Sequence, residues 1–167
     1  MFRNLCLALL LTATAGSGAS AETRHERAHD SKGNIEALIA RHAAANHLPE
    51  ALVRRVIKRE SRGNPRAVSK GNYGLMQIRL GTARALGYRG TVKGLLDADT
   101  NMTYAVKYLA GAYRAADGNL DRAVHYYAAG YYYAAKRKGL LDDNKPNLTK
   151  AYATAAANGS ASSDVMK

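Results

Sequence analysis

Apolar residues recur at helical spacing through the middle of the chain. In the segment LVRRVIKRESRGNP (52–65), four of them lie at three- and four-residue steps, the period of one helix face: Leu52, Val53, Val56 and Ile57. Glu60 is the next residue on this stripe, whereas the basic residues of the segment lie largely off it. A carboxylate on the apolar face of a helix therefore requires an explanation.

The same pattern predicts where this helix and four others begin and end. Pro49 suits the first turn of the helix that carries Glu60, and Gly63 and Asn64-Pro65 end that helix near Arg62. The other predicted helices begin at Asn34 (with Ile35, Leu38, Ile39 and His42 on one face), span 80–87, span 99–116 (with Met102, Ala105, Val106, Leu109 and Tyr113 inward), and run from 120 to Gly139. Strand signals are few. The predicted fold class is mainly α, with at most a small β-hairpin between Val68 and Ile78.

The N-terminal segment has the layout of a secretory signal peptide. Arg3 precedes an apolar run that is too short to anchor the chain in a bilayer, and small residues lead to Ala21, after which cleavage is expected. Cys6, the only cysteine, lies inside this run, so the mature chain has no thiol and no disulfide. The sequence therefore predicts a protein exported to the periplasm or secreted, without an integral membrane anchor.

The rest of the chain divides into three parts by composition. Residues 22–32 are charged and aperiodic, and predict a flexible lead-in. Residues 33–141 carry the helical pattern and predict one domain. Residues 142–167 lose apolar periodicity and become rich in Ala, Asn, Ser and Gly, which predicts a disordered tail.

The charge of the chain favours an anionic polymer as its partner. After removal of residues 1–21, 24 basic residues stand against 13 acidic ones, a net charge of +11. Nucleic acid is the usual partner of so basic a chain. Export argues against nucleic acid and for the cell wall, whose stem peptides carry carboxylates.

The segment ESRGNPRAVSKGNYGLMQIRLGTARALG (60–87) resembles the signature of the lytic transglycosylases of the soluble transglycosylase (SLT) type, which have a lysozyme-like fold. Matching residues follow in the family's order through the remainder of the body: Leu95, Asp97, Asn101, Tyr108-Leu109, Ala123, Tyr127 and Ala129-Gly130. The sequence departs from the family in two places. The spacing from Ser69 to Gly74 is one residue shorter than usual, which predicts a tighter loop, and Ala128 replaces a frequent asparagine.

The resemblance implies that Glu60 is the catalytic acid that cleaves the bond between N-acetylmuramic acid and N-acetylglucosamine in peptidoglycan. Burial on an apolar face raises the pKa of a carboxyl and keeps it protonated. Ordinary glycosidases use two carboxylates, yet no glutamate follows Glu60 and no aspartate lies in segment 60–87. The resemblance therefore implies that Glu60 acts first as acid and then as base, which closes a 1,6-anhydro ring without water.

Five further residues are predicted to bind substrate, each with a structural alternative. Ser69 and Gln77 match groove-lining positions of the family, but Ser69 could close its own turn and Gln77 could begin a helix in solvent. Gly74 would let the glycan approach the backbone. Met76 falls in the same motif, although methionine commonly fills a core. Tyr127 matches a tyrosine near the acid, although tyrosines at helical spacing commonly pack.

Three functions remain open from the sequence: a lytic transglycosylase, a hydrolytic muramidase on the same fold, and a peptidoglycan-binding module without turnover. The expected partners are peptidoglycan glycan strands and, by analogy with small domains of this type, an envelope-spanning secretion machine. We expect a monomer that binds no nucleic acid. His25 and His29 lack a third ligand, and the other histidines lack ligand spacing. The sequence predicts no metal and no cofactor.

Overall fold

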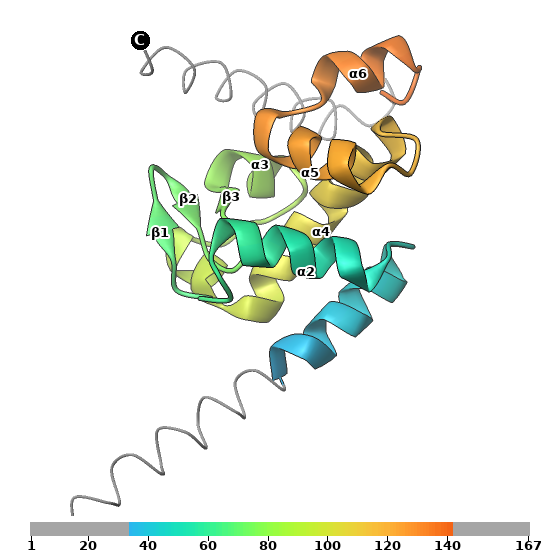
Figure 1. The fold of residues 1–167 in the computed structure, drawn as a ribbon. Coiled ribbons are helices and arrows are strands. Elements are labelled where there is room, and N and C mark those ends of the chain that lie inside the picture. The colour runs from blue at the N-terminus through green and yellow to red at the C-terminus, as the bar shows by residue number, and fades with distance from the viewer. Residues whose placement is uncertain (1–33, 142–167) are drawn as a thin grey trace, which may run out of the picture. The chain divides into compact units, whose positions relative to one another are not determined.

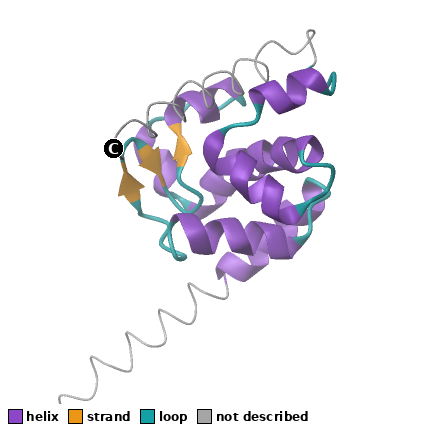
Figure 2. Ribbon diagram, turned by 45° about the horizontal axis from the view of Figure 1, so that its top comes forward, coloured by secondary structure: helices purple, strands orange, loops and turns teal. Residues whose placement is uncertain are grey.

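The computed structural model describes residues 34–141, which include nearly all of the predicted catalytic domain (Figure 1). The predicted signal peptide (1–21), lead-in (22–32) and tail (142–167) lie outside the described residues. Helices predominate, as the sequence predicts, and the sheet is small (Figure 2). In chain order, the elements are a helix over residues 34–45, α2 (Glu50–Glu60), β1 (Val68–Ser69), β2 (Asn72–Tyr73), β3 (Ile78–Arg79), α3 (Leu80–Ala85), the 3₁₀ helix η1 (Val92–Leu96), α4 (Ala98–Ala115), α5 (Leu120–Ala129) and α6 (Tyr132–Arg137).

Helix α2 forms where the apolar stripe predicts it. The four stripe residues before Glu60 are buried, and Pro49 stands at the N-cap, one position before the helix. The charges also suit the helix dipole, because Glu50 lies in the first turn and Lys58 and Arg59 lie in the last. Helix α2 ends at Glu60 itself, so Glu60 stands where the helix gives way to a loop.

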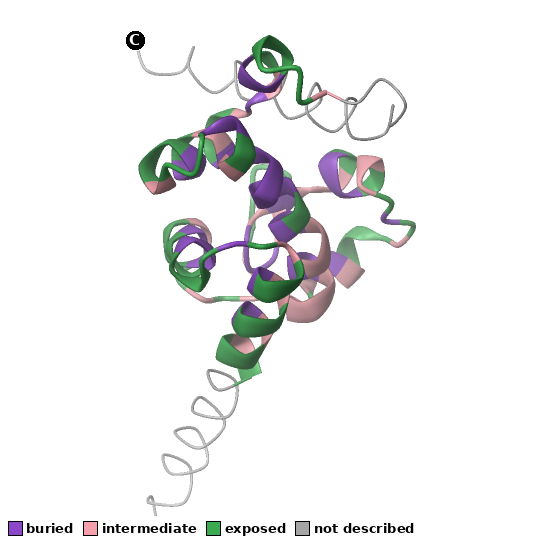
Figure 3. Ribbon diagram, turned by 90° about the vertical axis from the view of Figure 1, so that its right-hand side faces the viewer, coloured by how far each residue is buried: buried purple, intermediate pink, exposed green. Residues whose placement is uncertain are grey.

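Helix α4 runs through the middle of the described residues and packs against α5, α6, η1 and β3. Ten of its residues are buried, which places most of its circumference inside the core (Figure 3). The inward residues predicted for this helix are buried except for Tyr113, which is partly exposed. An Asp97 carboxylate caps the helix by accepting a hydrogen bond from the Thr100 N–H at 2.8 Å. Such a central helix can hold side chains of several neighbours in place.

The sheet has three antiparallel strands in the order β1-β2-β3, one more than the predicted hairpin. Positive φ angles at Lys70 (48°) and Gly71 (77°) make a two-residue turn between β1 and β2. This turn is the tighter loop that the short spacing predicts. Paired residues of neighbouring strands share a face of a sheet. Tyr73 and Ile78 form the row that packs on the core, and the other row is Ser69, Asn72 and Arg79.

The prediction of a single last helix to Gly139 is wrong. The chain breaks at Gly130, whose φ of 87° and ψ of 155° lie in a region that glycine alone adopts readily. The turn reverses the chain between α5 and α6 and buries Tyr131, whose hydroxyl donates to the Tyr108 carbonyl at 2.8 Å. Burial of one tyrosine against α4 thus replaces the continuation of a helix.

Candidate active site around Glu60

Glu60 is half-buried at the last position of α2, with its side chain 22% exposed. Burial raises its pKa, and the Arg59 guanidinium, 3.8 Å away, opposes this shift without cancelling it. The C-terminal end of a helix carries partial negative charge, which also disfavours an ionised carboxyl. The fold therefore makes ionisation of Glu60 less favourable than that of an exposed glutamate, the direction of shift that the sequence predicts from burial on an apolar face.

Ser61 fastens the end of α2 to the segment Gly74–Gln77, the loop between β2 and β3. Its hydroxyl donates to the Leu75 carbonyl at 2.6 Å and accepts from the Gly63 N–H at 3.2 Å. The residue after the candidate acid is thus bonded to the loop that carries most of the other predicted site residues. This bond fixes the position of Glu60 relative to that loop.

Asn101 of α4 holds the same loop from inside the core. Its side chain is fully buried, and its amide nitrogen donates to the Tyr73 and Leu95 carbonyls, both at 2.8 Å. Its amide oxygen accepts from the Met76 N–H at 2.9 Å. Buried backbone groups need such partners because desolvation without a hydrogen bond is costly. Asn101 therefore ties β2, the loop and η1 together through three of their backbone groups.

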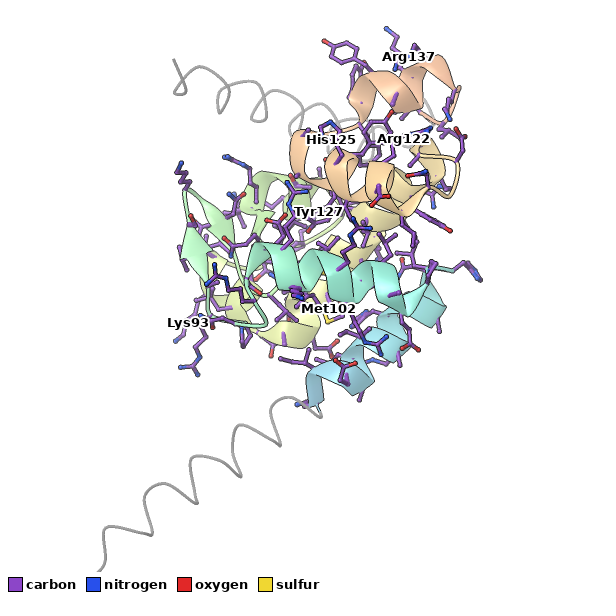
Figure 4. All side chains as sticks on the ribbon, in the orientation of Figure 1. Lys93, Met102, Arg122, His125, Tyr127 and Arg137 are labelled. Atoms are coloured by element: carbon purple, nitrogen blue, oxygen red, sulfur yellow. The ribbon has the colours of Figure 1, made fainter. Side chains whose placement is uncertain are left out.

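Tyr127 holds the loop from a third side, projecting from α5 toward α2 and the sheet (Figure 4). Its hydroxyl donates to the Met76 carbonyl at 2.8 Å, and its ring packs edge-on against Tyr108. Burial raises the Tyr127 pKa well above its usual value, and the negative charge of ionised Glu60 adds to the effect. A negative charge on Glu60 therefore disfavours ionisation of Tyr127. The hydroxyl of Tyr127 bonds to the loop, so its predicted contact with substrate stays a prediction.

The loop has an unusual backbone that Gln77 stabilises. Gln77 has a φ of 50°, which is uncommon for a residue other than glycine. Its side-chain amide donates to the Ala67 carbonyl at 3.0 Å and to the Gly74 carbonyl at 2.9 Å. Gln77 thus joins the loop at Gly74 to the segment before β1 at Ala67, and it does not begin a helix. Its contact with a sugar stays a prediction.

Gly74 and Met76 have clear structural roles. A Cβ atom at Gly74 would lie 2.1 Å from the Leu95 carbonyl oxygen and 2.3 Å from the Asn101 amide nitrogen, so internal packing already requires glycine there. The Met76 side chain is fully buried, which favours its role as core filler over contact with a ligand. Substrate binding by either residue stays untested.

Ser69 is exposed on β1. Within residues 34–141 its hydroxyl makes no hydrogen bond, so it does not close its own turn and is free to meet a ligand. Ala128, the departure from the family asparagine, is exposed on α5 next to Tyr127.

Each described aspartate has a partner of its own. Asp99 pairs with Arg41 and His42, Asp117 with Arg122 and Lys138, and Asp121 with Arg55, and Asp97 caps α4. These partners lower the pKa of Asp99 and of Asp117. All four carboxylates are thus engaged by groups other than Glu60.

Sequence reasoning assigned no role to Ser61 or Asn101, although both lie at positions that resemble the family. For Asn101 a signal exists in the sequence, because an asparagine next to Met102 on an apolar helix face has to find partners when it is buried. For Ser61 the pattern holds no comparable signal, because the carbonyl that it meets is 14 residues away.

The family model described as Transglycosylase SLT domain matches residues 37–149, more than half of the chain. Comparison with solved structures found no match. Within residues 34–141, no helix is both long and apolar enough to cross a membrane.

Proposed function

Because the chain belongs to the transglycosylase SLT domain family, whose general activity is lytic transglycosylation, we propose that it cleaves the β-1,4 bond between N-acetylmuramic acid and N-acetylglucosamine in peptidoglycan. The products are glycan strands that end in 1,6-anhydromuramic acid. The single observation that carries this proposal is the half-buried Glu60 with its raised pKa, at the position that resembles the family's catalytic acid.

In the proposed first step the Glu60 carboxyl donates its proton to the glycosidic oxygen as the bond from that oxygen to C1 breaks. The N-acetyl oxygen of the muramic acid stabilises the positive charge that develops at C1. This group replaces the second carboxylate of ordinary glycosidases. The engagement of the described aspartates elsewhere supports a mechanism with one protein carboxyl.

In the second step the Glu60 carboxylate accepts the proton of the C6 hydroxyl of the same muramic acid. The C6 oxygen forms the new bond to C1 and closes the anhydro ring. Glu60 regains its proton, and no water is consumed. A partly exposed carboxyl suits both steps, because it must keep its proton before the reaction and reach the sugar during it.

The rigid surroundings of Glu60 support this use of a single residue. Hydrogen bonds from Ser61, Asn101 and Tyr127 hold the loop beside the acid. Catalytic groups need such support because small misplacements lower the rate strongly. We assign these three residues positioning roles and place Ser69 and Gln77 as candidates for contact with the sugar.

Mass spectrometry of the muropeptides released from purified peptidoglycan tests the proposal. The wild-type protein is expected to release anhydro-muropeptides, and a Glu60→Gln variant is expected to release none. Reducing ends from the wild type would instead identify a hydrolytic muramidase. Absence of release by the wild type would reject the enzymatic function and leave a wall-binding module.

We further propose export to the periplasm and local opening of the wall for an envelope-spanning secretion machine. The support for export is the pattern of residues 1–21. N-terminal sequencing of the protein recovered from the periplasm tests this, and Glu22 is the expected first residue.

A further inference from the structure

The net positive charge of the described residues is concentrated in the segment that follows Glu60 in the sequence. Residues 61–96 contain no acidic residue and seven basic ones: Arg62, Arg66, Lys70, Arg79, Arg84, Arg89 and Lys93. The other described residues, 34–60 and 97–141, contain eleven basic and seven acidic residues. We call residues 61–96 the cationic lobe. Its elements form one unit, because β2 contacts η1 and β3 contacts α3.

The cations of the lobe have no ionic partner within residues 34–141. Each ion pair in this part of the chain joins residues outside the lobe. Six of the seven cations are exposed, and Arg79 is partly exposed. In Figure 4, nitrogen-tipped side chains surround the sheet, and Lys93 lies at the edge of the lobe. The lobe therefore presents positive charge that the described fold does not neutralise.

The sheet row made of Ser69, Asn72 and Arg79 brings one of these cations onto the same face as Ser69, a predicted site residue. Ser69, Asn72 and Arg79 are paired across the three strands and so share a face. The Arg79 guanidinium reaches toward the β1–β2 turn, where one of its nitrogens lies 3.9 Å from the position of a Cβ on Gly71. A ligand that contacts the exposed Ser69 hydroxyl thus meets a cation of the lobe on the same surface.

We propose that the cationic lobe binds the stem-peptide carboxylates of the glycan strand that Glu60 cleaves, so that the enzyme selects peptide-bearing strands over stripped glycan. This inference rests on the proposed function. Five of the seven cations are arginines, whose planar guanidinium matches a carboxylate with two parallel hydrogen bonds. The stem peptides are attached to the muramic acids, so a strand bound at Glu60 carries carboxylates past the lobe.

Binding of soluble glycan strands, measured by fluorescence anisotropy, tests the proposal without turnover. All proteins carry Glu60→Gln, so the result is independent of whether the wild type is a transglycosylase. An exposed ion pair changes affinity by roughly 1.5- to 5-fold. With several contacts, peptide-bearing strands are expected to bind about tenfold more tightly than strands whose peptides have been removed. The preference should shrink as salt rises, because exposed charges are screened.

Two triple variants distinguish an effect of the charge of the lobe from an effect of the total charge of the protein. In the lobe variant Lys70, Arg79 and Arg84 become glutamine. In the control variant the exposed cations Arg114, Lys136 and Arg137 become glutamine, which removes the same charge outside the lobe. The lobe variant should lose the preference for peptide-bearing strands, and the control variant should keep it.

Four results would overturn the proposal. The first is equal binding of peptide-bearing and stripped strands. The second is an equal loss of preference in both triple variants, which would reduce the effect to total charge. The third is unchanged binding after the stem-peptide carboxylates are amidated. The fourth is tighter binding of polyphosphate than of peptide-bearing strands. Either of the last two would assign the lobe to another anion.

Discussion

Replacement of Asn101 by alanine is expected to destabilise the fold by about 4 kcal/mol. The variant removes three hydrogen bonds of 2.8–2.9 Å: two buried ones, with the Met76 N–H and the Leu95 carbonyl, and a partly buried one, with the Tyr73 carbonyl. At about 1 kcal/mol each, these bonds account for ~3 kcal/mol. The cavity left by the amide adds ~1 kcal/mol. Domains are stable by only about 5–15 kcal/mol, so urea unfolding should show a large fall in the midpoint.

An Asn101→Asp variant examines the hydrogen bonds without a cavity. Aspartate has the shape of asparagine, but its second oxygen would face the Tyr73 and Leu95 carbonyls and repel them. The protonated form can donate one hydrogen bond, so the folded state should hold the proton more tightly than the unfolded chain. Stability then falls as pH rises through the range from the unfolded pKa, about 3.9, to the raised folded pKa. Urea unfolding at pH 4 and pH 7 should show a larger loss at pH 7.

A Thr103→Ala variant is the matched control on the same helix. The Thr103 hydroxyl is partly buried and donates only to the Asp99 carbonyl, one turn earlier, so its loss should cost less than about 1 kcal/mol. The reasoning fails if Asn101→Ala loses no more stability than this control, or if Asn101→Asp loses the same amount at both pH values.

The remaining predictions concern the residues around the acid. Glu60→Gln should be more stable than the wild type at neutral pH and equal to it near pH 4, because burial raises the pKa of Glu60 in the folded protein above its ordinary 4.5. A tenfold difference in proton affinity between the folded and unfolded states corresponds to about 1.4 kcal/mol. Urea unfolding at both pH values checks this prediction, and equal stability at both would contradict it. Tyr127→Phe should lose about 1–2 kcal/mol, because the Met76 carbonyl loses its buried donor while the ring packing on Tyr108 remains; an unchanged urea midpoint would mean that water replaces the hydroxyl. Ser61→Ala should lower the free energy of unfolding by only about 1 kcal/mol, because one hydrogen bond is lost, yet it should slow the release of anhydro-muropeptides. An unchanged rate of release would disprove this prediction.

The sequence predicts well those parts of the fold that follow from local pattern. The apolar stripe of α2 and the long inward face of α4 each span several turns, so their periodicity is unambiguous. Two details do not follow from local pattern. The sheet is small, as predicted, but its third strand, β3, has only two residues, too few for an alternating pattern to appear. Gly130 lies within a run of alanines and tyrosines that suits a helix, and only the burial of Tyr131 on α4 favours the break.

In the candidate site, too, some residues follow from local sequence pattern and others depend on distant parts of the chain. Glu60 is predicted as the acid because its position on an apolar stripe and its resemblance to the family agree. The roles of Asn101 and Ser61 depend on backbone groups that approach from far along the chain: Met76 lies 25 residues before Asn101, and Leu75 lies 14 residues after Ser61. No local pattern contains such distances. Met76 and Gly74 have packing roles that the motif alone does not show, and their predicted contact with substrate stays a prediction.

The loop Gly74–Gln77 explains why so short a segment carries so much of the resemblance. Helix α2 bonds to it through Ser61, α4 through Asn101 and α5 through Tyr127. On the loop, the Leu75 and Met76 carbonyls accept the hydrogen bonds of Ser61 and Tyr127, and the Met76 N–H donates to Asn101. A change in any one partner shifts the loop, and through Ser61 it also shifts the residue next to Glu60. The position of the acid is therefore set by the packing of three helices together, so variants of Asn101 or Tyr127 should impair catalysis at temperatures at which the protein is still folded.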